Sequence, residues 1–353
     1  MASAPTSLVE TLRRLPKAEL HQHLDGALRP QTAVELAAEV GLSLSLDEAR
    51  QRLVAPVRCW DQADLLSYFD LPISLLQSTA ALRRAATELV GDMAADGTTY
   101  GEIRWAPRLH MDGGLGVSDV IEAVSNGVAD AREAAGSSSP MIGLIVTAMR
   151  SHPPGANVEL AHQAAAFGPP VVGFDLAGPE AEYPDPPHAA AFRAAGAAGL
   201  GLTAHAGETP GSAHIWEVLE FGISRVAHGA PAIDDPDLVA SLREREITLD
   251  LCPTSNVQAG IVPDLAAHPV ARLHRAGVSV TLSTDDRTVA GTTLSDELAR
   301  VALETGMMPD ELAEIAINGF RRGFSVPLEL ATRRAEAARA WHAWAGTPAP
   351  LSG

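Results

Sequence analysis

Short apolar segments recur along the 353-residue chain, and each is followed by a stretch rich in Ala, Leu and Glu. The short segments are typical of buried strands, and the stretches between them have helical character. Eight strands are predicted, over 18–23, 99–105, 141–148, 171–176, 200–205, 225–228, 247–251 and 278–283. This alternation is expected of a parallel sheet covered by helices. Eight repeats close such a sheet, whereas a doubly wound open sheet usually has fewer strands, so we predict an α/β fold, a (β/α)8 barrel of the TIM type.

The regions outside this alternation are also helical in character. Residues 24–98 follow the first strand, with helices predicted over 31–40, 63–73 and 80–95, and we expect this insertion to cap one mouth of the barrel. Three more helices are predicted after the last strand, over 295–305, 309–318 and 328–345. Pro/Gly-rich breaks follow predicted strands, where they read as loops between strand and helix, not as domain linkers. We therefore predict one domain over 1–345 and a disordered tail over 346–353.

Charge and composition exclude several classes of partner. The chain has 26 Lys and Arg against 44 Asp and Glu, a formal charge of −18, and no run of basic residues longer than two. Nucleic acid and anionic membrane surfaces need a basic face, so neither is expected as a partner. Two cysteines cannot form a disulfide framework, and neither a signal peptide nor a membrane-spanning run is apparent. A cytoplasmic location is expected.

The first candidate for chemistry is the pair His21 and His23 at the end of the first predicted strand. Side chains at i and i+2 of a strand point to the same face, so the two imidazoles can converge on one metal ion. Alone this pattern is weak, because a chain with 12 histidines contains such pairs by chance. Two histidines that lie on the surface or pack in the core would give the same sequence pattern.

Three other predicted strands end in titratable residues, and this shared position strengthens the interpretation. They are His205 with Glu208 after the fifth strand, His228 at the sixth, and Asp285 with Asp286 after the eighth. The carboxyl ends of barrel strands are where catalytic groups gather. Taken singly, either aspartate could cap a helix and Glu208 could be a solvated loop charge.

Three imidazoles and one carboxylate form a reasonable open zinc site that leaves one position for water. The predicted ligands are His21, His23, His205 and Asp285, and the candidates for acid and base work are Glu208, His228 and Asp286. A bound metal lowers the pKa of water from 15.7 toward about 7, which favours hydrolysis. The Pro-Cys-x-x-Cys zinc signature of the cytidine deaminase fold is absent because Thr254 and Ser255 follow Cys252-Pro253, so that fold is excluded.

His152, just past the end of the third predicted strand, could line the pocket, and the remaining histidines have no role in this chemistry. We expect seven of them, in helices or loops without convergent partners, to be solvated or simply packed: His110, His162, His188, His214, His268, His274 and His342.

The order of the motifs resembles a known family. Residues 15–26, Leu-Pro-Lys-Ala-Glu-Leu-His-Gln-His-Leu-Asp-Gly, are similar to the N-terminal signature of the adenosine deaminase family. The resemblance continues to about residue 324 through Asp-Leu-Ala-Gly at 175–178, His-Ala-Gly-Glu at 205–208, His-Gly at 228–229, Cys-Pro-Thr-Ser-Asn at 252–256 and Thr-Asp-Asp at 284–286. It implies a zinc-dependent hydrolase on a (β/α)8 barrel, with one Zn²⁺ per chain, that adds water to C6 of a purine and releases ammonia.

The resemblance also implies a role for each matching residue. The zinc ligands are the four residues already predicted. Glu208 matches the acid that protonates purine N1, His228 the group that deprotonates and orients the water, and Asp286 the residue that hydrogen-bonds the hydroxide and guides the departing amine. The substrate contacts implied are Asp25 to the ribose 5'-hydroxyl, the backbone N–H of Gly178 to purine N3, and His23 beside the metal.

Two departures bear on the substrate. Asp25 replaces the Glu typical of adenine deaminases that act on the free base, which implies a nucleoside, adenosine or 2'-deoxyadenosine, and a place in purine salvage. Arg287 stands where the family often has Pro, and Arg287 or Arg108 could pair with an anionic group on a modified 5' position, as in aminodeoxyfutalosine. Surface arginines are the plainer alternative. A non-catalytic metal-bound barrel, an amidohydrolase of cyclic amides, the oligomeric state and the native metal stay open.

Overall fold

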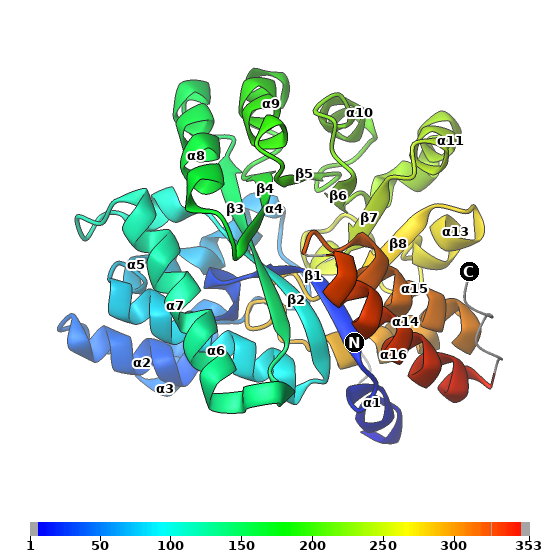
Figure 1. The fold of residues 1–353 in the computed structure, drawn as a ribbon, viewed down its shortest axis with the longest axis horizontal. Coiled ribbons are helices and arrows are strands. Elements are labelled where there is room, and N and C mark those ends of the chain that lie inside the picture. Colours follow the sequence, from blue (N-terminus) through cyan, green and yellow to red (C-terminus); the bar gives the residue numbers. More distant parts are fainter. Residues whose placement is uncertain (1–5, 326, 347–353) are drawn as a thin grey trace.

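Eight parallel strands, adjacent in chain order, form the barrel (Figure 1). The structure is a computed structural model that describes residues 6–325 and 327–346. The strands are β1 (Lys17–His23), β2 (Thr98–Trp105), β3 (Met141–Met149), β4 (Val171–Ala177), β5 (Gly201–Ala206), β6 (Arg225–His228), β7 (Thr248–Leu251) and β8 (Ser279–Leu282). Each predicted strand is found within one residue at either end, because strands buried on both faces read as short apolar runs. The barrel prediction is confirmed.

The first and last strands meet through the segment that follows β8. Gln22 and Asp285 form a parallel bridge. The N–H of His23 donates to the carbonyl of Asp285 at 2.7 Å, and the N–H of Asp285 donates to the carbonyl of His21 at 3.0 Å. The Ser283 hydroxyl accepts from the N–H of His21 at 3.1 Å. The seam of the barrel therefore lies at residues predicted to bind metal.

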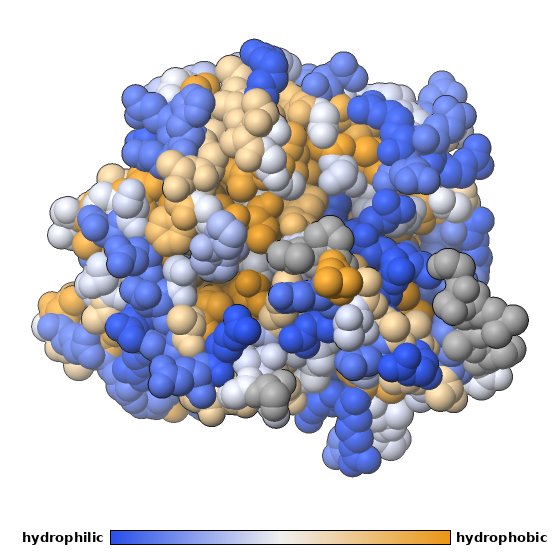
Figure 2. Space-filling view, viewed as in Figure 1, coloured by the Kyte–Doolittle hydropathy of each residue, from blue (hydrophilic) through white to orange (hydrophobic). Residues whose placement is uncertain are grey.

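Helices surround the strands on the outside (Figure 1). Those between strands are α6 (Thr79–Ala95), α7 (Val117–Ala135), α8 (Pro154–Phe167), α9 (Ala189–Ala197), α10 (Ala213–Leu219), α11 (Pro236–Glu244), α12 (Pro253–Gln258) and α13 (Val270–Arg275). On the face seen in Figure 2, hydrophobic residues gather over α9, whose sequence is mostly alanine, with hydrophilic residues at the margins. The core is continuous from the strands to the inner faces of these helices.

The chain ends pack beside the seam. A first helix, α1 (Thr6–Arg13), precedes β1 and was not predicted. Helices α14 (Leu294–Glu304), α15 (Pro309–Arg322) and α16 (Pro327–Ala345) follow β8, as predicted. Helix α15 contacts both β1 and β8. A Cβ at Gly319 of α15 would lie 2.7 Å from the Cβ of Ala18, so glycine permits this close approach. The predicted tail over 346–353 lies outside the described residues apart from Gly346, and the single-domain boundary stays a prediction.

The insertion after β1 is helical, with two departures from prediction. Its helices before α6 are α2 (Pro30–Glu39), α3 (Leu46–Leu53), α4 (Gln62–Leu66) and α5 (Asp70–Leu75). The helix predicted over 63–73 is split by a 3-10 turn at Ser67–Phe69. Pro72 lacks the N–H that a continuous helix would use there. Helix α3 was not predicted, although Ser45 and Glu48 form the capping box that marks its start.

Within the described chain, no helix combines the length and the hydropathy needed to cross a bilayer. Both cysteines, Cys59 and Cys252, are free and buried.

Candidate active site

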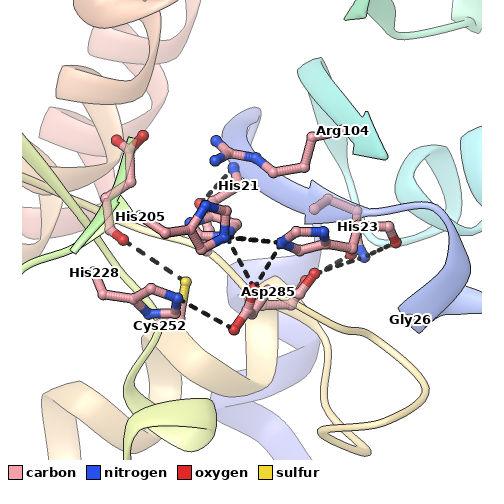
Figure 3. Close-up of polar contacts among 12 residues, drawn as sticks. His21, His23, Gly26, Arg104, His205, His228, Cys252 and Asp285 are labelled. Atoms are coloured by element: carbon pink, nitrogen blue, oxygen red, sulfur yellow. Dashed lines mark hydrogen bonds and ion pairs between the residues drawn. The ribbon is translucent and has the colours of Figure 1, made fainter. Parts of the chain in front are cut away.

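The four predicted metal ligands converge at the carboxyl ends of the strands. The Nε2 atoms of His21 and His23 are 3.2 Å apart, and those of His23 and His205 are 3.1 Å apart. Oδ1 of Asp285 lies 2.9 Å from Nε2 of His21 and 3.3 Å from Nε2 of His23. Figure 3 shows these three rings turned toward the Asp285 carboxylate. The structure thus brings together residues from β1, β5 and the loop after β8.

The protonation of these groups suits a divalent cation. Nδ1 of His205 lies 3.1 Å from Oδ2 of Asp175, which is also paired with Arg104 at 3.3 Å. Donation to this carboxylate leaves the lone pair of His205 on Nε2, facing the other imidazoles. Burial lowers the pKa of His21 and of His205, so both rings are neutral. Three imidazole nitrogens, two of them 2.9 and 3.3 Å from one oxygen of Asp285 and the third 3.1 Å from His23, match the donor set of an open zinc site.

Two overlapping sets of side chains have ligand atoms within 4.8 Å of one another at this point. One set is His21, His205, His228 and Asp285, and the other is His23, Asp285 and Asp286. The geometry alone therefore leaves His228 and His23 as competitors for one ligand position.

His228 closes the other side of the group. Its Nε2 lies 3.7 Å from Oδ2 of Asp285 and 3.6 Å from Oε1 of Glu208. His228 has φ 70° and Asp285 has φ 65°, in the left-handed region that non-glycine residues rarely occupy. Such strain is typical of functional sites, and here it occurs where two strands end. Burial lowers the pKa of His228 to about 3, so the imidazole is neutral.

Glu208 lies in the loop after β5 with its side chain largely buried. Burial, together with the negative charges of Glu180 and Asp285, raises the pKa of Glu208 to about 8. A carboxyl with such a pKa is mostly protonated at neutral pH and can act as a general acid.

Glu180, which the sequence did not single out, holds the loop that carries Glu208. Its buried carboxylate accepts from the backbone N–H groups of Gly207 at 2.8 Å, Glu208 at 2.7 Å and Thr209 at 3.1 Å. The residue stands two positions after the Asp-Leu-Ala-Gly motif, but its type alone does not distinguish it from a solvated loop glutamate. Glu180 therefore both positions Glu208 and, as a like charge, favours its protonated form.

Asp286 is buried next to Gly26. Burial, with the negative charge of Asp285, raises the pKa of Asp286 well above its usual value. Its Oδ1 has no hydrogen-bond partner in the part of the chain that the structure describes. A Cβ at Gly26 would lie 1.9 Å from this oxygen, so only glycine leaves room for the carboxyl at this position.

A cavity of about 880 Å³, counting the open space at its mouth, lies above these groups. Predicted substrate contacts His23, Asp25 and Gly178 line it, and the segment from α4 to α5 covers it with Gln62, Leu65, Leu66, Phe69, Asp70 and Ile73. Five of the described lining residues are acidic and none is Lys or Arg.

The two arginines considered for substrate binding are engaged elsewhere. Arg287 pairs with Glu19 at 3.2 Å and lies 3.8 Å from Asp96. Arg108 pairs with Glu159 at 3.4 Å. Neither is among the described residues that line the cavity.

At least five of the seven histidines expected to lack convergent partners have them, so that expectation is wrong for His110, His188, His214, His268 and His274. His110 is buried, with Nε2 3.8 Å from Oδ2 of Asp25. Burial alone would raise the pKa of Asp25, but the hydrogen bond and charge of His110 outweigh it, and the pKa of this carboxyl is lowered. His268 is buried and contacts Asn256 at 3.1 Å. The partners are distant in sequence, so no local pattern could have revealed them.

Comparison with known proteins adds a family context. The model of a family described as adenosine deaminase matches residues 16–330. An adenosine deaminase of Mycolicibacterium gilvum (strain PYR-GCK) is 39% identical over 343 residues, covering 92% of this chain and 94% of that protein.

Solved structures with the same architecture differ in substrate. An adenine deaminase from Arthrobacter aurescens has a TM-score of 0.85 at 26% identity, covering 92% of this chain and 98% of that chain. An amidohydrolase from Burkholderia ambifaria, with bound Zn, has a TM-score of 0.88 at 25% identity, covering 98% and 95%. The N6-methyl-AMP deaminase from Arabidopsis thaliana has a TM-score of 0.83 at 25% identity, covering 94% and 98%. The substrate therefore has to be argued from the cavity.

Proposed function

This chain belongs to the adenosine deaminase family, and from that premise we propose that it hydrolyses adenosine and 2'-deoxyadenosine to inosine and 2'-deoxyinosine, with release of ammonia. One observation carries the proposal: three imidazoles and the Asp285 carboxylate converge beside Glu208, whose pKa is raised to about 8, at the base of a cavity.

Zinc is the cofactor we propose, one ion per chain. The residues that would hold it are His21, His23, His205 and Asp285, whose donor atoms face one another. When bound, Zn²⁺ lowers the pKa of a water molecule from 15.7 toward about 7 and so supplies the nucleophile. The bound Zn of the Burkholderia ambifaria amidohydrolase supports this choice.

The neighbouring side chains handle the protons. Glu208 gives its proton to purine N1, which makes C6 electrophilic toward the attacking water oxygen. Asp286 hydrogen-bonds this oxygen and guides one of the two water protons to the exocyclic amine, which leaves as ammonia, while the second water proton restores the Glu208 carboxyl. The C6–N bond breaks as the C6–O bond forms, with no net change in oxidation state.

The charges of the cavity favour a neutral nucleoside over a nucleotide. A 5'-phosphate would bring further negative charge among five acidic side chains, with no cation among the described lining residues to pair with it. The Asp25 carboxylate, kept ionised beside His110, is suited to accept a hydrogen bond from a ribose 5'-hydroxyl. Free adenine has no ribose hydroxyl to donate to this buried carboxylate, which selects against the base. The same reasoning disfavours a 5'-modified nucleoside with an anionic group, since Arg287 and Arg108 are engaged elsewhere.

A substrate panel with the zinc-loaded enzyme tests the proposal. Ammonia release is measured with adenosine, 2'-deoxyadenosine, adenine and AMP, and kcat/KM is compared. We expect turnover of both nucleosides, and kcat/KM at least about 10²-fold lower for AMP and adenine. Chelation should abolish turnover and added Zn²⁺ should restore it. Faster turnover of AMP or adenine contradicts the nucleoside assignment, and no ammonia from any of the four supports a non-catalytic barrel or an amidohydrolase of cyclic amides.

The setting we propose is purine salvage in a reducing cytoplasm. The two free, buried cysteines support it, since neither needs oxidation for the fold to form.

A further inference from the structure

Asn256, the last residue of the Cys-Pro-Thr-Ser-Asn motif, has no part in the function described so far. It lies in α12, directly after β7, and is fully buried. Its side chain stands between two histidines. Nδ2 is 3.1 Å from Nδ1 of His228, and Oδ1 is 3.1 Å from Nε2 of His268. The amide therefore connects a residue of the candidate active site to one outside it.

The direction of these hydrogen bonds is set by a backbone group. Helix α13 begins at Val270, whose N–H lies in the first turn and has no acceptor within the helix. This N–H donates to Nδ1 of His268 at 3.3 Å. A backbone N–H can only donate, so Nδ1 of His268 carries a lone pair and the ring proton is on Nε2. Burial also lowers the pKa of His268 to about 3, in agreement with a neutral ring.

The protonation of His268 in turn determines the orientation of the Asn256 amide and the protonated nitrogen of His228. The Nε2–H of His268 requires an acceptor, so Oδ1 of Asn256 faces it and the opposite orientation of the amide is excluded. Nδ2 of Asn256 then donates to Nδ1 of His228, which must hold a lone pair. The single proton of the neutral His228 ring is left on Nε2. This nitrogen is buried and has no hydrogen-bond partner among the described residues.

We propose that Val270, His268 and Asn256 form a relay that fixes His228 as the Nε2–H tautomer, so that His228 presents a donor to the site. The first consequence concerns the metal. A ligand must offer a lone pair, so His228 is not a ligand through Nε2, and His23 takes the third nitrogen position. The relay therefore leaves His21, His23 and His205 as the nitrogen ligands beside Asp285, which is the combination that the sequence predicts.

The second consequence rests on the proposed function. A protonated Nε2 cannot take a proton from water, so His228 is not the base that the family resemblance implies. It donates a hydrogen bond to the attacking oxygen instead, from a position 3.7 Å from Asp285 and 3.6 Å from Glu208. Proton acceptance is left to the carboxylates of the site. Asn256 and His268 are thus positioning residues, which act on the reaction only through His228.

Nuclear magnetic resonance of the zinc-loaded protein tests the relay directly. Long-range proton–nitrogen correlations of ¹⁵N-histidine-labelled protein report which ring nitrogen carries the proton, and His228→Gln assigns the His228 signals. We expect the proton of His228 on Nε2. A proton on Nδ1, or a His228 nitrogen bound to the metal, overturns the proposal, and this result needs no variant to fold.

Asn256→Asp reverses the relay at constant size. A carboxylate accepts from both neighbours, so the proton of His228 should move to Nδ1, and kcat should fall about 10–100-fold with little change in KM. A proton that stays on Nε2 in this variant overturns the proposal. Asn157→Asp is the matched control, because Nδ2 of the buried Asn157 is 3.0 Å from Nδ1 of His188, away from the ligand histidines. We expect it to leave the His228 signals unchanged.

A second pair of variants separates positioning from packing. His268→Ala removes the donor that orients the Asn256 amide, so His228 should show both tautomers and kcat should fall about tenfold. His268→Gln keeps an amide donor toward Asn256 and should restore one tautomer and most of kcat. Equal loss in both variants, with an unchanged His228 spectrum, overturns the relay.

The spectra also distinguish the two proposals. An Nε2–H signal in a protein that deaminates no adenine nucleoside refutes the proposed function and supports the relay. Turnover of adenosine with the proton on Nδ1 supports the function and refutes the relay.

Discussion

Two clusters of buried charge occupy the inside of the barrel, and they are organised differently. The deeper one centres on Arg225, the first residue of β6, which pairs with Glu102 and, at 3.0 Å, with Asp250. The Tyr100 hydroxyl donates to Glu102 at 2.5 Å, and the guanidinium lies 3.8 Å above the ring of Phe324. In this cluster the cation has carboxylates on two sides, and Arg225, both carboxylates and Tyr100 are closed to solvent.

The cluster at the mouth of the barrel leaves its charges unbalanced. Asp285, Asp286 and Glu208 lie beside neutral imidazoles, and two of the three carboxyls have a raised pKa. Buried carboxylates that are paired with a cation of the protein can stabilise the fold. Buried acids without such a partner cost folding free energy unless a bound cation or substrate pairs with them. The contrast teaches where to look for function in such a barrel: among buried charges that the protein itself does not pair.

The largest effect on activity is expected from Glu208→Gln. Gln cannot deliver a proton, so kcat/KM for adenosine should fall about 10²–10⁴-fold. The free energy of unfolding should stay the same or rise, because a buried unpaired carboxyl is removed. Steady-state kinetics and urea unfolding measure the two quantities. Glu304→Gln, at the end of α14, should change neither, and a Glu208→Gln enzyme with more than a tenth of the original rate would contradict the acid role.

The opposite result is expected from Arg225→Met in the deeper cluster. Two buried carboxylates lose their cation, which should lower the free energy of unfolding by about 3–5 kcal/mol. The kcat of the folded fraction should stay within about twofold, since Arg225 touches none of the groups at the mouth. Arg83→Met, which breaks an exposed pair with Asp130, should cost at most about 1 kcal/mol. If urea unfolding showed that Arg225→Met and Arg83→Met destabilise the protein equally, the buried cluster would contribute no more to stability than an exposed ion pair.

Gly26→Ala tests how tightly the mouth is packed. The new Cβ would meet Oδ1 of Asp286 at 1.9 Å, and the displaced carboxyl should lower kcat about 10²-fold. In the control, Gly91→Ala, a Cβ meets nothing within 4 Å in the middle of α6. That change should leave kcat as it is and stabilise the protein by about 0.5–1 kcal/mol. Full activity of the Gly26→Ala enzyme would show that Asp286 can move without consequence.

The smallest effect is a change of pH profile in Glu180→Gln. Glu208 acts as an acid only while protonated, so kcat/KM should fall as the pH rises past its pKa, which is raised to about 8. Removing the negative charge of Glu180 lowers that pKa, so the fall should begin at a lower pH. Rates measured between pH 6 and 10 decide this. An alkaline limb that stays in place or moves upward would show that Glu180 has no electrostatic influence on Glu208.

The sequence predicts the strands and the main site residues for related reasons. Buried parallel strands are short apolar runs, and a barrel gathers the residues that follow them, so His205 and Asp285 could be placed near His21 without coordinates. The supporting residues could not be found in this way. Glu180 binds backbone N–H groups of a distant loop, and His268 reads like a surface histidine until α13 supplies its partner. The helical break at Ser67–Phe69 depends on how the insertion folds over the cavity, which local propensity does not determine.

Asp285 contributes its carboxylate to the candidate metal site and its main chain to the joint between β1 and the end of β8. Residues 21 and 23 leave the ribosome early, whereas Asp285 emerges only after the last strand has been made. A nascent chain therefore cannot assemble the site, and metal capture is confined to molecules whose synthesis has passed this residue. Truncated chains that end before Asp285 lack both its contact with β1 and its carboxylate. Retention of a metal would therefore distinguish completed chains from truncated ones.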